Sequence, residues 1–118
     1  ASPVETSIGL KVPIKELNML KRRCSSKLML DATGSIGLEE GHNLSDVSTF
    51  SSCKGLFGLT GASFIAYNSD PKNSVKSFYM DINTHINKKL TGPYHTIGSL
   101  YHVLKNYNKF KNAVKKIN

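Results

Sequence analysis

The segment from Cys53 to Tyr67 constrains the fold of this chain more than any other. It is the least charged window of the sequence, and Lys54 is its only charged residue. Apolar side chains such as those of this segment are the ones most often buried in folded proteins. We therefore expect the amphipathic and basic segments on either side to pack against it.

Three glycines leave the secondary structure of this segment open. In a helix, Gly58, Ala62 and Ala66 would recur every four residues and let another helix approach closely. Alternatively, Gly55–Gly61 forms a loop and Ala62–Tyr67 a short buried strand. Each glycine costs a helix about 1 kcal/mol relative to alanine, which weighs against the helix. A buried helix and a loop followed by a strand are therefore both predicted as alternatives.

The Gly-Leu-Phe-Gly sequence at 55–58, followed by small and aromatic residues, resembles viral fusion peptides and membrane-inserting hairpins in composition. This resemblance makes Leu56, Phe57 and Phe64 candidates for contact with a membrane. The segment is too short to cross a bilayer, which takes roughly 20 apolar residues. The alternative is that it forms the core of a small soluble domain.

The two cysteines suggest a covalent link in a small core. A chain of 118 residues of which 39% are hydrophobic fits one domain with a modest core that benefits from such a link. A Cys24–Cys53 disulfide would close a loop of about 30 residues and add roughly 3.5 kcal/mol in the chain-entropy model. The alternative is two free thiols in a cytosolic protein.

The first residues, Ala1-Ser2-Pro3, look like an N-terminus left after removal of a signal peptide. Together with the predicted disulfide, they favour a secreted protein. Asn43-Leu44-Ser45 also matches the acceptor pattern for N-glycosylation, although this pattern is common by chance.

Helical spacing and capping residues predict three amphipathic helices, near 13–28, 71–91 and 99–117. A turn signal at Thr33-Gly34-Ser35 favours a minor β-hairpin near 28–40. The predicted fold is therefore a small single α+β domain. Its amphipathic helices surround the central apolar segment, and one disulfide links them.

Positive charge is concentrated at the C-terminal end. The net charge is +8, and the last 37 residues hold seven lysines and no acidic side chain. This charge favours an anionic cell surface, an anionic membrane or an acidic protein as partner. Nucleic acid is a weaker prediction because no known binding module is visible. The candidate surface-binding residues are Lys105, Lys109, Lys111, Lys115 and Lys116.

We find no catalytic, cofactor-binding or metal-binding motif. Two of the four histidines with a lysine could form a small ribonuclease, and a cavity lined by Phe57, Phe64, Phe78 and Leu100 could carry a lipid or another small hydrophobic ligand. The interpretation we favour is a secreted, non-enzymatic basic protein of the toxin, effector or defence type that acts by binding. The carrier and the ribonuclease are the alternatives.

Overall fold

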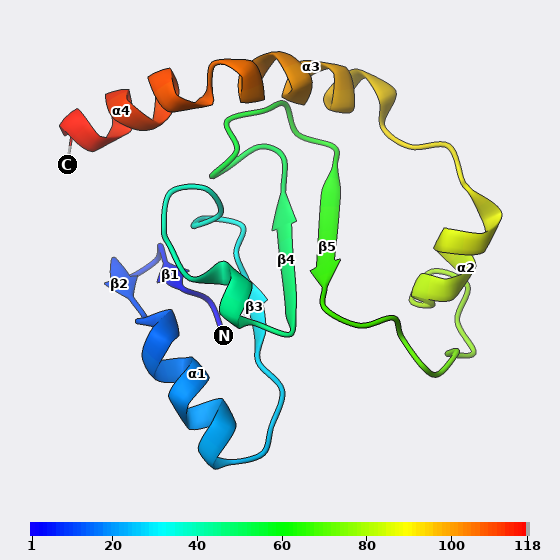
Figure 1. Ribbon diagram of the computed structural model, residues 1–118. Helices are drawn as coiled ribbons and strands as arrows, with labels where there is room; N and C mark the ends of the chain where they lie inside the picture. The colour runs from blue at the N-terminus through cyan, green and yellow to red at the C-terminus, as the bar shows by residue number, and fades with distance from the viewer. Residues whose placement is uncertain (118) are drawn as a thin grey trace.

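A three-stranded sheet lies at the centre of the computed structural model, which describes residues 1–117 (Figure 1). Its strands are β3 (Met29–Asp31), β4 (Val47–Ser51) and β5 (Ser63–Tyr67), in the order β3-β4-β5. β3 runs parallel to β4, and β5 runs antiparallel to it. Both β3 and β4 therefore end at the same edge of the sheet.

The apolar segment forms a loop followed by a strand, rather than a helix. Its glycines permit close approach of backbone segments within the loop. A Cβ atom at Gly58 would lie 2.9 Å from the carbonyl oxygen of Ser52, and Gly61 adopts a φ of +116° just before β5. Gly58, Ala62 and Ala66 consequently do not form a helical stripe.

Four helices and a second, two-stranded sheet complete a small mixed α+β domain, as predicted at that level. An N-terminal hairpin pairs β1 with β2, and a short 3-10 helix precedes β4. The bounds of these elements are β1 (Val4–Glu5), β2 (Leu10–Lys11), α1 (Ile14–Arg23), η1 (His42–Leu44), α2 (Ile82–Lys88), α3 (Tyr94–Lys105) and α4 (Tyr107–Ile117).

Each predicted helix differs in extent from the observed one. α1 stops at Arg23, because Ser25 adopts a φ of +50° and turns the chain toward β3. The helix predicted over 71–91 is only the seven residues of α2. The helix predicted over 99–117 starts earlier, at Tyr94, and is interrupted at Asn106, whose side-chain amide donates to the carbonyl of His102 at 3.2 Å.

The predicted hairpin at 28–40 is wrong. Its first half pairs with β4 instead of folding back on residues 36–40. The following backbone forms helical turns: the N–H groups of Ser35 and Ile36 donate to the carbonyl of Ala32, and that of Glu39 donates to Ser35. Local hydrogen bonds thus use the donors that a second strand would have needed.

The predicted Cys24–Cys53 disulfide is also wrong, since both thiols are free. Cys24 caps α1 before β3 begins, whereas Cys53 follows the end of β4. Because β3 and β4 are parallel, these positions lie at opposite ends of the sheet. The five residues of β4 span about 16 Å, and a disulfide requires Cα atoms within about 7 Å.

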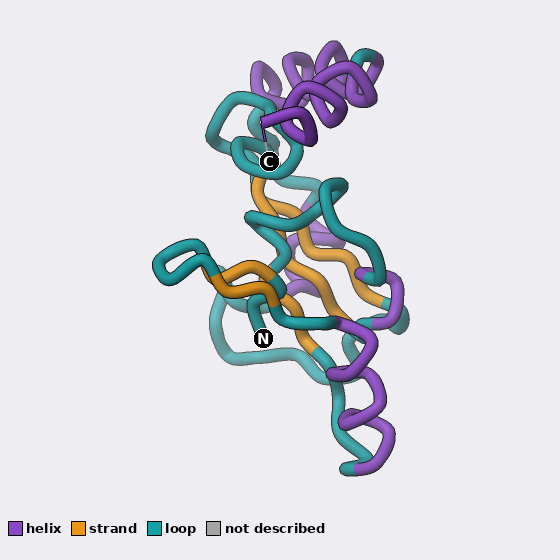
Figure 2. Tube along the Cα trace, turned by 90° about the vertical axis from the view of Figure 1, so that its left-hand side faces the viewer, coloured by secondary structure: helices purple, strands orange, loops and turns teal. Residues whose placement is uncertain are grey.

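The hydrophobic core is small and lies where α1 packs beside the sheet. Ile14, Leu28 and Leu30 form it, with Leu17 and Leu44 packed against them. Figure 2 shows α1 near one end of the sheet and the C-terminal helices beyond the other. The radius of gyration is 15.9 Å, whereas a compact domain of this length has about 13.5 Å. The open shape leaves many apolar side chains exposed.

Within residues 1–117, every helix is too short or too polar to traverse a lipid bilayer.

Candidate functional site

The edge where β3 and β4 end carries Asp31 at the end of β3 and Lys54 in the loop after β4. Asp31 is the last residue of β3, and Lys54 lies three positions after the end of β4. In open sheets with parallel strands, ligands bind outside the carboxyl ends of those strands. This edge is therefore the place in the fold to look for a site.

Backbone hydrogen bonds join the two loops through Thr33. The N–H of Thr33 donates to the Asp31 carboxylate at 3.1 Å, and the carbonyl of Thr33 accepts from the N–H of Gly55 at 3.2 Å. One residue thus contacts both the Asp31 side chain and the peptide bond that follows Lys54. The backbone of Lys54 is held near the Asp31 carboxylate in this way.

Gly55 allows this close approach because it has no side chain. A Cβ atom there would lie 2.5 Å from the carbonyl oxygen of Ile36. The carbonyl of Gly55 accepts a hydrogen bond from the Tyr107 hydroxyl at 2.8 Å. Both backbone polar groups of Gly55 are therefore used, and the residue is buried.

Ser52 closes the rest of the loop between β4 and β5. It is fully buried, and its hydroxyl donates to the carbonyl of Leu59 at 2.5 Å. The same oxygen accepts from the N–H of Ala62 at 3.3 Å, and the Ser52 carbonyl accepts from the N–H of Gly58 at 2.7 Å. Residues 52–62 form a closed loop with Lys54 on its exposed side.

The charges at this edge are available to a ligand. The ion pairs found among residues 1–117 are Lys11–Glu39, Lys21–Asp46 and Lys27–Asp46, so the Lys54 amine and the Asp31 carboxylate take part in none of them. Both side chains are exposed. A hydrogen bond with Ser51 lowers the pKa of the neighbouring Cys53 thiol, and the positive charge of Lys54 contributes to this shift.

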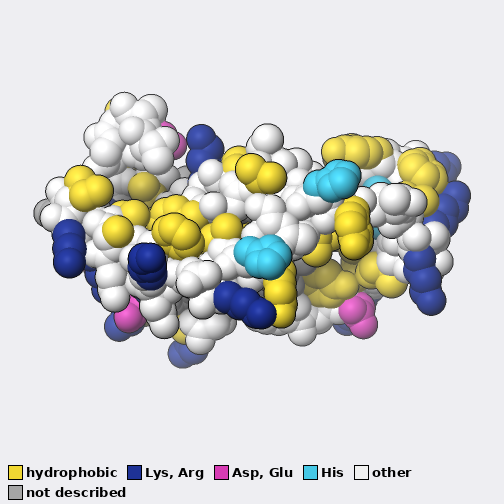
Figure 3. All heavy atoms as spheres, turned by 90° about the horizontal axis from the view of Figure 1, so that it is seen from above, with side chains coloured by type: hydrophobic (Ala, Val, Ile, Leu, Met, Phe, Trp, Pro, Cys, Tyr) yellow, Lys and Arg dark blue, Asp and Glu magenta, His cyan; other side chains and the backbone are white. Residues whose placement is uncertain are grey.

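The lysines predicted to bind an anionic surface lie on α3 and α4. Lys105, Lys109, Lys115 and Lys116 are exposed, and Lys111 is half-buried. The Lys105 amine lies 4.5 Å from the centre of the Tyr101 ring. Figure 3 shows lysine, histidine and apolar side chains interspersed on the face seen from above. Binding of an anionic partner by these lysines stays a prediction.

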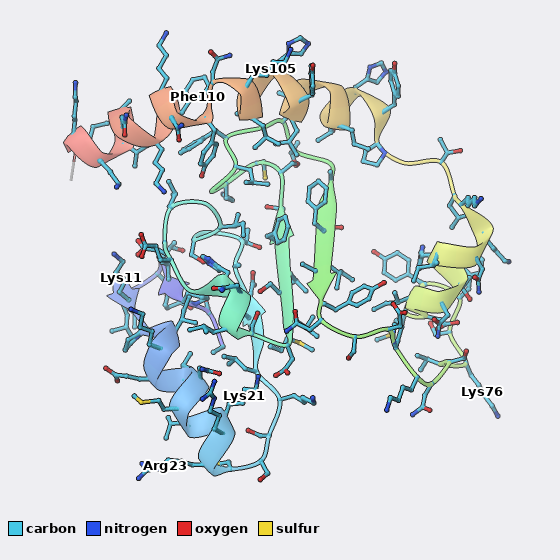
Figure 4. All side chains as sticks on the ribbon, viewed as in Figure 1. Lys11, Lys21, Arg23, Lys76, Lys105 and Phe110 are labelled. Carbon is cyan, nitrogen blue, oxygen red and sulfur yellow. The ribbon has the colours of Figure 1, made fainter. Side chains whose placement is uncertain are left out.

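The residues predicted to contact a membrane are partly covered by protein. The Phe57 ring centre lies 5.7 Å from that of Tyr107 and 6.1 Å from that of Phe110. Phe64 stacks on Phe50 with ring centres 5.2 Å apart, and Leu56 is half-buried. Membrane contact by these residues stays a prediction. Figure 4 marks Phe110 on α4 and Lys105 on α3, across the loop end of the sheet.

The carrier prediction requires four side chains to share one cavity, and three of them have different aromatic neighbours. Phe57 packs on Tyr107, Phe64 on Phe50, and Phe78 on His85. The fourth, Leu100, is buried on α3. The carrier function stays a prediction.

The four histidines have separate neighbours in the structure. His42 contacts the buried Ser35, with Nε2 and Oγ 2.9 Å apart, and burial lowers the pKa of His42. His85 contacts the carbonyl of Tyr79 at 2.8 Å, and the other two, His95 and His102, each lie beside an adjacent tyrosine. The ribonuclease stays a prediction. No three His, Cys, Asp or Glu side chains within residues 1–117 are grouped so that they could hold a metal.

Neither protein-family models nor the sequences of curated proteins give a match to this chain. Solved structures do. An alanine–glyoxylate aminotransferase from Nostoc sp. is similar over 88% of this chain, with a TM-score of 0.74 and 24% identity. A phosphoserine aminotransferase from Cytophaga hutchinsonii is similar over 86%, with a TM-score of 0.51 and 21% identity.

The likeness indicates a shared fold over part of those enzymes. The chain spans 32% of the first structure's length and 27% of the second's. The prediction of a toxin, effector or defence protein is corrected by this result, because the structures that share the fold are aminotransferases. Secretion stays a prediction and has lost the disulfide as support.

Local sequence patterns identify neither residue of the candidate site. Lys54 stands out in the sequence only as the one charge in an apolar window, and Asp31 falls within the segment predicted as a hairpin. A single lysine in a glycine-rich loop after a strand was a usable signal. The link to Asp31 required the parallel pairing of β3 with β4, which no local pattern indicates.

Proposed function

We propose that this chain takes part in amino-group transfer between an amino acid and a 2-oxo acid, with pyridoxal phosphate held by Lys54 and Asp31. The observation that carries the proposal is that this carboxylate ends β3 and this lysine lies in the loop after β4, at the shared edge of two adjacent parallel strands. The similarity of the fold to two aminotransferases supports it.

The residues at this edge fit the cofactor chemically. Proteins hold pyridoxal phosphate through a lysine amine, with an acidic or basic side chain beside the nitrogen of its ring. The amine of Lys54 has no acidic partner among the ion pairs of residues 1–117. Of the two carboxylate oxygens of Asp31, Oδ1 accepts the hydrogen bond of Thr33, which leaves Oδ2 for a ligand.

Each residue has a distinct task in the proposed reaction. The Lys54 amine would hold the cofactor covalently at its aldehyde carbon, and as a free amine it would accept a proton. The Asp31 carboxylate would favour a proton on the ring nitrogen. Bound pyridoxal phosphate supplies an electron sink for the α-carbon of the amino acid.

The overall exchange is balanced without an external oxidant. One amino acid loses its amino group and becomes a 2-oxo acid, and a second 2-oxo acid receives that group and becomes an amino acid.

Site-specific trapping tests the proposal. The chain is incubated with pyridoxal phosphate and reduced with borohydride, and the modified lysines are located by peptide mass spectrometry. We expect Lys54 to be modified at the lowest cofactor concentration, ahead of the other 13 lysines. Asp31→Asn should weaken this preference, and Lys76→Gln, which changes an exposed lysine far from the site, should leave it unchanged. Equal modification of all lysines would overturn the proposal.

We also propose that α4 binds an anionic partner, on the separate observation that three of its four candidate lysines, Lys109, Lys115 and Lys116, are exposed. No acidic side chain follows Asp81 in the sequence. Such binding depends on screening and weakens as salt rises.

A further inference from the structure

Tyr107 links α4 to both loops of the candidate site. Its hydroxyl donates to the carbonyl of Gly55 at 2.8 Å, and the carbonyl of Ile36 lies at 3.4 Å as a second, longer acceptor. These contacts join residues that are 52 and 71 positions apart in the sequence. One side chain thus contacts the loop after β3 and the loop after β4.

The loop after β3 is shaped to receive the Tyr107 hydroxyl. Gly37 has a φ of +74°, and a Cβ atom there would overlap the hydroxyl oxygen and ring of Tyr107. The ring is half-buried against Phe57, and burial raises the pKa of Tyr107. The hydroxyl therefore remains protonated, and able to donate, at neutral pH.

These contacts act on the backbone beside Lys54. The N–H of Gly55 belongs to the peptide unit that follows Lys54, and it donates to Thr33. The carbonyl of Gly55 belongs to the next peptide unit, which Tyr107 fixes. With the peptide units on both sides of Gly55 held, the backbone that leaves Lys54 is fixed relative to the loop that follows Asp31.

We propose that Tyr107 is a positioning residue that holds the Lys54 backbone beside Asp31 and thereby sets how strongly Lys54 takes up pyridoxal phosphate. The inference rests on the proposed function of Lys54. It assigns to α4 a role in the site, although no residue of α4 is required to touch the cofactor. Catalytic sites depend on such supporting contacts, because reactive groups must be held within about 0.5 Å of their working position.

Tyr107→Phe tests the inference, since it removes the hydroxyl and keeps the ring. Phe110→Leu is the matched control, because it loosens the contact of α4 with Phe57 and leaves the hydroxyl in place. Both are made in a Gly98→Ala background. A methyl group at Gly98 meets open space inside α3, and the change is expected to stabilise the helix, so that loss of one hydrogen bond does not unfold the chain.

Two measurements are made on each variant. Hydrogen exchange of the Gly55 amide is followed without cofactor, and the pyridoxal phosphate concentration that half-modifies Lys54 is found by borohydride trapping. For Tyr107→Phe we expect faster exchange and a threefold to tenfold higher half-modifying concentration, roughly the contribution of one hydrogen bond. For Phe110→Leu we expect both values to stay within about twofold of the background chain.

The outcomes separate this inference from the proposed function. If Lys54 is trapped preferentially in the background chain and equally well in Tyr107→Phe, the inference fails and the proposed function stands. If both variants weaken trapping to the same degree, Tyr107 acts only through helix docking and the inference also fails. If Lys54 is not preferred even in the background chain, the proposed function fails and the inference fails with it.

Discussion

The loops after β3 and β4 are held far more tightly than the segment 68–92 that contains α2. Ser35 and Ser52 in these loops are fully buried, and hydrogen bonds tie Gly55 on both sides. In segment 68–92, Asp81 is the one buried residue. Its large apolar side chains are open to solvent, with exposed fractions of 56% for Phe78, 83% for Tyr79 and 72% for Met80.

Apolar content does not explain this difference, because both regions contain aromatic residues. The loops are ordered by serine hydroxyls that satisfy backbone groups and by glycines that let two backbones touch. Segment 68–92 makes mainly local hydrogen bonds, such as those from Thr84 to Asp81 and from His85 to Tyr79. The tightly held region is the one that carries Lys54, as a site requires.

The largest effect should come from a core residue of β3, the strand that leads into the first of these loops. Leu30 is fully buried beside Ile14 and Leu28, so Leu30→Ala is expected to lower the free energy of unfolding by about 2–5 kcal/mol. Met80→Ala, in segment 68–92, should change it by less than about 0.5 kcal/mol. Urea unfolding followed by circular dichroism measures both. Similar losses for the two variants would remove the contrast between the regions.

Glycine substitutions sharpen the comparison at the site itself. A methyl group at Gly55 would collide with the backbone oxygen of Ile36, so Gly55→Ala should cost about 1–3 kcal/mol of unfolding free energy. At Gly92 the nearest atom, the Cδ1 of Ile97, lies 3.6 Å away. Gly92→Ala should therefore be tolerated. Gly55→Ala should also reduce trapping of pyridoxal phosphate at Lys54, and unchanged stability in this variant would contradict the proposed close packing.

These particular residues show what the sequence could and could not predict. Local periodicity predicts the α+β class and the approximate positions of α1 and the C-terminal helices. It also predicts β5, as one of two alternatives for its segment. The pairing of β3 with β4 does not, because residues 29–31 find their partner 18 positions later. The disulfide prediction failed for the same reason, since it assumed that Cys24, on the apolar face of its helix, lies within reach of the central apolar segment.

The candidate site depended entirely on this long-range pairing. Asp31 and Lys54 have no common motif in the sequence, and only parallel strands bring them to one edge. The role of Tyr107 is still less visible, because its acceptors at Ile36 and Gly55 are backbone carbonyls. Backbone acceptors leave no trace in side-chain patterns.

The pH dependence of stability that arises from His42 is a smaller effect, and it tests whether the loop after β3 is tightly held. Burial lowers the pKa of His42 in the folded chain, so below pH about 6.5 the unfolded chain binds a proton that the folded chain does not. Unfolding free energy should then fall as the pH drops from 7.5 to 5.5. Glu39, which faces His42, moderates the effect. His42→Gln should flatten this pH dependence, whereas His85→Gln, at an exposed position, should leave it unchanged.

Thermal melts at several pH values measure the His42 effect, and the two glutamine variants are compared at each pH. A parent chain that is equally stable at pH 5.5 and 7.5 would contradict it. The contact between His42 and Ser35 spans the loop after β3, so the measurement also reports on the order of that loop.

The smallest effect on stability should come from replacing exposed lysines. These replacements compare the charge of α4 with that of segment 68–92, and not their packing. Lys109 and Lys116 are exposed on α4, and Lys72 and Lys76 are exposed before α2. Replacing either pair by glutamine should change the unfolding free energy by less than about 0.5 kcal/mol.

On a polyanion column, the Lys109→Gln/Lys116→Gln variant should elute at clearly lower salt than the Lys72→Gln/Lys76→Gln variant. The α4 lysines lie in a stretch without acids, whereas the other pair lies between Asp70 and Asp81, whose negative charges offset it. Equal elution of the two variants would mean that retention follows net charge alone and that α4 is not a distinct anionic-binding surface.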